Sequence, residues 1–188
     1  MKRAILAVSA LLLTGCLSQS VAADGPTYDT VVALEAEADA VVVATVGELV
    51  GKEIDGGGEP EVDGEGEIVG IPMEFWSVDV ERVLAGDAPD TLTVAWIDQR
   101  TIRIEGRLSE FSVGDELVLY LVHQPADATP GLKSVEDVWV PLSGDNGVMD
   151  IDGDKVIARS ELLTGLTSPG KVGVPLTATV DELESALT

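Results

Sequence analysis

The chain has 188 residues, of which 34 are acidic and 11 are lysine or arginine, so its formal net charge at pH 7 is −23. A surface this acidic repels nucleic acids and anionic lipid headgroups, which excludes a nucleic acid as partner. The length suits one domain with a real hydrophobic core. Cys16 is the only cysteine, so the fold must rest on that core and not on an internal disulfide.

The N-terminus has the three parts of an export signal. Residues 1–3 are positively charged, and residues 4–13 form an apolar run that is too short to span about 30 Å of hydrocarbon. The run ends in Leu13-Thr14-Gly15-Cys16, which resembles the lipobox of bacterial lipoproteins. The resemblance implies cleavage between Gly15 and Cys16, with acylation of the new N-terminal cysteine. An ordinary signal peptide cut near Val21-Ala22-Ala23 is the alternative.

The resemblance sets the expected organisation of the chain. Residues 1–15 are the signal peptide, residues 16–27 are a lipidated flexible tether, and residues 28–188 are a single acidic domain. Because two or more acyl chains make a stable anchor, we expect the protein to be held at the cell membrane by lipid on Cys16, on the extracytoplasmic face.

The first elements of the domain follow from its residue patterns. Residues 28–39 predict a short helix with Asp29 as N-cap and with Val31, Leu34 and Ala38 on one side. Residues 40–50 are rich in β-branched side chains and open continuously apolar, which is typical of a strand buried on both faces. Glycine and acidic residues dominate residues 51–70, so we expect a long mobile loop there.

Alternating patterns return after this loop. In residues 75–84, Trp76, Val78 and Val80 share one face of a predicted strand. Leu92, Val94 and Trp96 alternate in a third strand, and residues 101–105 add a further short one.

The second half of the chain contains more strand signals and a helix. Residues 113–115 predict a turn, and residues 116–123 and 135–140 predict strands. Asp152-Gly153 predicts a hairpin between strands at 148–151 and 155–158. The tail predicts a helix over residues 180–187, with Thr179 as N-cap and Glu182 completing a capping box.

This pattern of elements predicts a mainly β domain with a short N-terminal and a C-terminal helix. Six to eight short strands favour a small closed or partly open antiparallel barrel, and a two-sheet β-sandwich is the alternative.

The segments of the domain are, in order, AVVVATV, loop, FWSVDVERVLAGD, TLTVAWI, FSVGDELVLYLV. The order of these segments resembles that in a group of uncharacterised secreted bacterial proteins. Their barrels are similar to the oligonucleotide/oligosaccharide-binding (OB) fold, as in the tissue inhibitors of metalloproteinases. Those inhibitors insert a disulfide-bonded N-terminal cysteine into the protease, whereas Cys16 here would be lipidated, so the resemblance implies a fold and no inhibition.

One segment carries the spacing of a calcium loop. Such loops need oxygen ligands at positions 1, 3, 5 and 12 and an apolar residue at position 8, a pattern that is met by Asp150, Asp152, Asp154, Glu161 and Ile157. Position 6 needs glycine for a sharp turn, and Lys155 stands there instead. Calcium binding is therefore the alternative to a plain hairpin that turns at Asp152-Gly153.

The sequence offers little for catalysis. His123 is the only histidine and ends an apolar strand, and zinc normally takes several histidine or cysteine ligands. Trp76, Trp96 and Trp139 lie in predicted strands with apolar neighbours, which favours burial over a solvent-facing platform for sugars or peptides.

We therefore expect a membrane-anchored lipoprotein that acts by binding and is not an enzyme, with an envelope protein as its possible partner and no cofactor besides possible calcium. The alternatives are a calcium- or cation-binding surface protein and a carrier of a small ligand such as a sugar or peptide.

Overall fold

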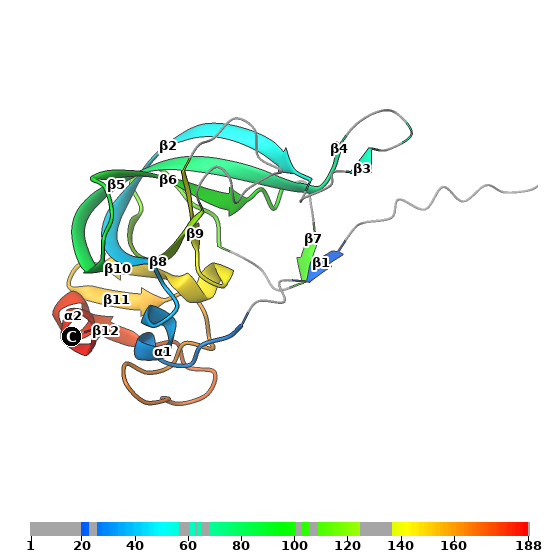
Figure 1. The fold of residues 1–188 in the computed structure, drawn as a ribbon. Helices are drawn as coiled ribbons and strands as arrows, with labels where there is room; N and C mark the ends of the chain where they lie inside the picture. The colour runs from blue at the N-terminus through cyan, green and yellow to red at the C-terminus, as the bar shows by residue number, and fades with distance from the viewer. Residues whose placement is uncertain are drawn as a thin grey trace, which may run out of the picture.

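A computed structural model describes residues 20–22, 26–56, 61–62, 64, 68–100, 103–105, 109–124 and 137–187. Within these ranges the protein is mainly β, as predicted (Figure 1). The helical elements are α1 (Val31–Glu35), α2 (Val180–Ala186) and the short 3₁₀ turn η1 (Gly144–Gly147). The strands are β1 (Ser20–Ala22), β2 (Ala40–Asp55), β3 (Glu61–Val62), β4 (Ile68–Val69), β5 (Ile71–Gly86), β6 (Thr91–Ile97), β7 (Arg103–Glu105), β8 (Glu116–Gln124), β9 (Val138–Pro141), β10 (Val148–Asp152), β11 (Lys155–Ala158) and β12 (Thr177–Thr179). No helix in these ranges is both long and apolar enough to cross a membrane.

Five strands close into a ring. The main sheet has the order β12-β11-β10-β8-β2-β5-β6-β9, and β9 pairs with β8 as well as with β6. One edge of β8 is shared, since its first half pairs with β10 and its second half with β9. The ring is therefore β8-β2-β5-β6-β9, and β10, β11 and β12 extend from it. The two small pairs, β1 with β7 and β3 with β4, lie outside this sheet. They correct two predictions, because β1 lies within the predicted flexible tether 16–27 and β3 and β4 lie within the predicted mobile loop 51–70, where pairing with another strand supplies the backbone hydrogen bonds.

The ring corrects the prediction that all its strands are antiparallel. The pairs β2–β5, β5–β6, β2–β8 and β8–β9 are antiparallel, whereas β6 and β9 are parallel, with Val94 opposite Trp139. The reason is topological. Strand direction alternates around an antiparallel ring, so a ring with an odd number of strands must contain a parallel pair.

The hairpin of β2 and β5 corrects the predicted extent of the loop. Each strand has 16 residues, and they stay paired out to Asp55 opposite Ile71. Residues 51–55, predicted as the start of the mobile loop, therefore belong to β2. The partner strand β5 supplies the backbone hydrogen bonds that keep these residues in a strand, although the glycine-rich local sequence does not predict one. Irregularities in the β2–β5 register are the kind of bulge that bends long strands and increases their twist.

Two hydrophobic cores lie on opposite sides of β2 and β8. Inside the ring, alternate residues of both strands, such as Val42 and Leu119, pack with Trp96, Phe111 and Trp139. On the outer face, the intervening residues pack against α1, α2 and the segment 163–176. The first half of β2 is buried on both faces, as the continuously apolar start of residues 40–50 predicted, and residues 117–121 of β8 are buried on both faces as well.

One of the two predicted helix N-caps is wrong and the other is confirmed. The N-cap of α1 is Thr30, not Asp29, and its side-chain oxygen accepts a hydrogen bond from the backbone N–H of Ala33. The backbone carbonyl of Asp29 instead accepts hydrogen bonds from the N–H groups of Thr164 and Gly165. The predicted capping box at the start of α2 is confirmed, since Thr179 and Glu182 bond each other reciprocally.

Candidate functional site

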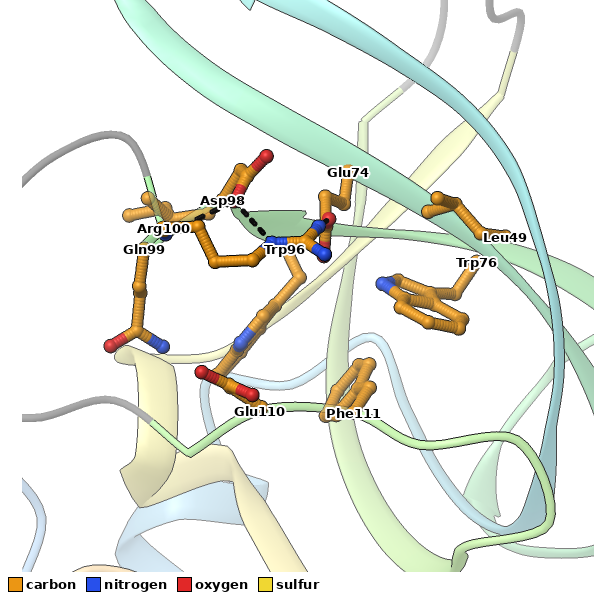
Figure 2. A pocket seen from close by; sticks show the side chains of 10 residues that line it. Leu49, Glu74, Trp76, Trp96, Asp98, Gln99, Arg100, Glu110 and Phe111 are labelled. Carbon is orange, nitrogen blue, oxygen red and sulfur yellow. Dashed lines mark hydrogen bonds and ion pairs between the residues drawn. The ribbon is translucent and has the colours of Figure 1, made fainter.

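A cavity of about 100 Å³ opens at one end of the ring (Figure 2). Ten residues line it: Leu49, Glu74, Trp76, Trp96, Ile97, Asp98, Gln99, Arg100, Glu110 and Phe111. This volume holds several water molecules, but it lies below the roughly 300–1,000 Å³ of ordinary small-molecule pockets. The cavity therefore has room for a group the size of an amino-acid side chain.

Strand alternation and register bring the lining together. Along β5, Glu74 and Trp76 are two residues apart, so both point to the inner face of the ring. Glu74 lies opposite Trp96 of β6, and Trp76 lies opposite Val94. The chain leaves β6 through Asp98 and Arg100, which places two charged side chains beside the aromatic ones.

The aromatic walls consist of Trp76, Trp96 and Phe111. The rings of Trp96 and Phe111 are stacked, with centroids 4.7 Å apart and an interplanar angle of 16°. The indole Nε1–H of Trp96 donates to the backbone carbonyl of Ser109 at 2.8 Å. The indole Nε1 of Trp76 is buried and has no hydrogen-bond partner among the described residues. Figure 2 shows this nitrogen turned toward the side of the cavity that Glu74 and Arg100 form.

The polar wall belongs to a charge-balanced group of four side chains, of which Glu74, Asp98 and Arg100 line the cavity and Lys52 does not. The Nζ of Lys52 lies 2.7 Å from Glu74 and 2.8 Å from Asp98. Arg100 pairs with the same two carboxylates, its Nε lying 3.0 Å from Asp98. Both acids are buried, whereas both cations reach solvent. Burying the carboxylates is tolerable because each one faces two cations, and their pairing leaves this wall without net charge.

The floor of the cavity is the segment 109–111, which two side chains fasten to the ring. The carboxylate of Asp145 accepts hydrogen bonds from the backbone N–H of Ser109 at 2.9 and 3.1 Å and from its hydroxyl at 3.2 Å. The guanidinium of Arg159 lies 5.7 Å from the ring centroid of Phe111 and donates to the carbonyl of Glu110. These contacts hold Phe111 against Trp96.

Burial raises the pKa of Asp145, although the hydrogen bonds from Ser109 and the charge of Arg159 act in the opposite direction. The folded protein therefore binds this proton more tightly than the unfolded chain does. The resulting stabilisation is fully present below the unfolded pKa of about 4 and is lost as pH rises through the raised folded pKa.

We expect the Asp145→Asn variant to escape this loss, because an amide keeps an acceptor for Ser109 and carries no charge. The variant should gain stability relative to wild type as the pH rises from about 4 to about 7. Urea unfolding of both proteins across this range measures the difference. A difference that stays the same at every pH would contradict the raised pKa.

The residues of the calcium prediction lie on the hairpin of β10 and β11 or just after it. The hairpin is confirmed, but its turn lies one residue later than predicted: Asp152 ends β10 and pairs with Lys155, so Gly153 and Asp154 form the turn, where Gly153 has a φ of +66°. The carboxylate of Asp150 is engaged by Arg159, which approaches to 2.7 Å. Asp154 is exposed in the turn between the two strands, and Glu161 is exposed after β11. Among the described residues, no three acidic, histidine or cysteine side chains are grouped so as to hold a metal ion.

We expect the melting temperature to be the same in excess calcium and in excess chelator, because Asp150 would have to leave Arg159 to join a metal site. Differential scanning calorimetry of the purified protein makes the comparison. A melting temperature that falls on chelation would revive the calcium interpretation.

His123 and Trp139 lie in the same part of the ring, away from the cavity lining. Their rings are stacked with centroids 4.7 Å apart, and the backbone N–H of His123 donates to the carboxylate of Asp39. Trp96 is buried, as its alternation with Val94 predicted, and Trp139 is buried, as its place in a predicted strand indicated. Trp76, which the alternation also favoured as buried, is partly buried.

The four charged residues of the cavity wall were not predicted. A signal for one of them exists in the sequence. Extending the alternation of Trp76 and Val78 back by two residues places Glu74 on the same inner face, where a carboxylate needs a cation. Its cations, Lys52 and Arg100, come from distant parts of the chain that no local pattern connects.

The predicted lipidation and cleavage site, Gly15 and Cys16, lies outside the described residues. Comparison with known proteins found no matching protein-family model, no similar curated protein and no similar solved structure.

Proposed function

We propose that the protein is an extracytoplasmic lipoprotein, anchored to the cell membrane by lipid on Cys16, whose ring domain is a non-catalytic binding module. The lipobox-like Leu13-Thr14-Gly15-Cys16 supports the anchor. The tether of residues 16–27 then keeps the domain close to the membrane, where it meets a protein of the envelope.

We also propose that the ring is an OB-like barrel. The OB fold is a five-stranded, partly open Greek-key barrel. The ring order β8-β2-β5-β6-β9 supports this class, because β9 follows β8 in the chain and returns to lie beside β6. The likeness concerns fold alone.

The cavity is the observation that carries the binding role. It combines aromatic walls, a polar wall whose carboxylates are paired with Arg100 and Lys52, and the buried indole N–H of Trp76, which has no partner among the described residues. A buried donor without an acceptor destabilises a protein by about 1–3 kcal/mol, and a bound acceptor removes that penalty. The volume suits one inserted side chain, which favours a protein or peptide partner over a larger ligand.

The experiment is site-specific photo-crosslinking in intact cells. A photoreactive amino acid replaces Glu110, which is exposed at the rim of the cavity, or, as a matched control, Asp181, which is exposed on α2. We expect one protein to be captured from position 110 and not from position 181. The Trp76→Phe substitution, which keeps an aromatic ring and removes the N–H, should reduce that capture severalfold.

The anchor is tested in the same cells. An alkyne-bearing fatty acid should label the wild-type protein and not the Cys16→Ser variant. Capture that is equal from both crosslinking positions would contradict the cavity as binding element, and label on both proteins or on neither would contradict lipidation of Cys16.

A further inference from the structure

One segment departs from the charge of the rest of the chain. Residues 162–180 contain no aspartate or glutamate, and Lys171 is their only charged residue. At the average density of the chain, 34 acids in 188 residues, a stretch of this length would hold about three. After the N-terminal residues 1–23, this is the longest segment without an acid. The acidic surface that repels anionic headgroups is therefore interrupted here.

The same segment exposes apolar side chains. Residues 167–174 are all exposed, with Val172 at 92% and Val174 at 47%, and Leu162 at the start of the loop is 55% exposed. Isolated exposed valines are ordinary on protein surfaces. Here three large apolar side chains coincide with the stretch that lacks acids.

Internal contacts fix this loop on the domain. Leu163 and Leu176 are buried in the outer core, and the N–H of Leu176 donates to the carbonyl of Leu163 at 2.8 Å. The N–H of Gly170 donates to the hydroxyl of Thr164 at 3.0 Å. The base of the loop is thus closed, and its exposed tip projects from a defined place.

That place is where the chain enters the domain from the tether. Val31 donates to the carbonyl of Gly165 at 3.0 Å, and Gly165 donates to the carbonyl of Asp29 at 3.1 Å. Figure 1 shows the N-terminal chain reaching α1 beside the orange loop. Part of the tether, Ser20–Ala22, pairs with Arg103–Glu105 as β1 and β7. The ten-residue span from Cys16 to Pro26, even when fully extended, keeps this entry point within about 35 Å of the lipid anchor.

We propose that the loop of residues 162–176 is the membrane-facing surface of the domain and lies against the headgroups of the bilayer that holds Cys16. This proposal rests on the lipid anchor proposed above. Without the charges of the signal peptide, 9 basic residues face 34 acidic ones. A domain this acidic, tethered beside an anionic surface, turns its acid-free loop toward that surface, with the exposed acids Asp29 and Glu161 left at the base of the loop. Val172 and Val174 then enter the interface, and Lys171 meets the lipid phosphates.

The test uses the full lipidated protein in vesicles of phosphatidylethanolamine and phosphatidylglycerol. Because Cys16 is the only cysteine and its thiol is blocked by lipid, a cysteine introduced at Val172 takes a fluorescent label at one position. Val113→Cys is the matched control, since Val113 is also an exposed valine in a turn (70%).

We expect the label at position 172 to shift its emission to the blue on vesicles, and to be quenched by an aqueous quencher at least threefold less than the label at position 113. In a second protein the label is attached to Thr167→Cys. In that protein, adding Val172→Asp should remove most of the protection from the quencher. The protein should stay bound through its lipid, and its fold should persist because Val172 is exposed.

The outcomes separate the inference from the anchor. Failure of the wild-type protein to float with vesicles contradicts the anchor. Flotation with equal quenching at positions 172 and 113 overturns the membrane-facing loop and leaves the anchor standing. Protection at position 172 on intact cells but not on vesicles also overturns it, because the occupant is then a protein.

Discussion

Replacing Gly86 by alanine is expected to lower the free energy of unfolding by about 3–5 kcal/mol. Gly86 ends β5 opposite Ala40 of β2, with a φ of +73° that side chains disfavour. A Cβ at this position would lie 2.0 Å from the backbone carbonyl oxygen of Asp39. The carbonyl group of Asp39 cannot move away freely, because the N–H of the same residue donates to the carbonyl of Leu121 in β8. The substitution therefore separates β5 from β2 at one end of the ring.

Gly114→Ala is the matched control. Gly114 has a similar φ of +88°, but a Cβ there would meet nothing within 4 Å. We expect a loss of only about 1 kcal/mol, from the backbone conformation alone. Urea unfolding followed by circular dichroism measures both variants. Equal losses would mean that the crowding at Asp39 relaxes without penalty.

Trp96→Ala is expected to destabilise the protein by about 3–5 kcal/mol, as large aromatic-to-alanine changes in a core do. Trp96 is buried inside the ring, stacks on Phe111 and bonds the carbonyl of Ser109. Its loss leaves a large void and frees the segment that forms the floor of the cavity.

Trp96→Phe separates these contributions. Phenylalanine keeps an aromatic ring against Phe111 but cannot donate to Ser109, so we expect a loss of about 1–2 kcal/mol. Chemical denaturation ranks the two variants. A phenylalanine variant as unstable as the alanine one would show that the hydrogen bond to Ser109, and not the packing, holds this segment.

The proposed roles of the cavity and of the loop fit one picture of the tethered domain. The loop faces the bilayer beside the entry of the tether. The cavity is formed by β2, β5, β6 and the segment 109–111, none of which contributes to that loop. A domain that rests on the membrane through residues 162–176 is thus proposed to present a separate surface to an envelope partner.

Some features were determined by the sequence itself because their physics is local. Alternation placed Trp76, Val78, Val94 and Trp96 on the inner faces of their strands. The hairpin at residues 152–155 and the Thr179 capping box depend on residues within three positions of one another. The two-sided burial of β2 was readable from its continuous apolar run.

Other features were decided only by the tertiary structure. The extension of β2 to Asp55 depends on pairing with Ile71, which a glycine-rich local sequence does not reveal. The parallel closure of β6 on β9 follows from the number of strands in the ring, which no single strand encodes. The same holds for the charged wall of the cavity. Glu74 meets Lys52 and Arg100 only because β2, β5 and the end of β6 are brought together by the fold, and ion pairs between distant residues leave no periodic signal in the sequence.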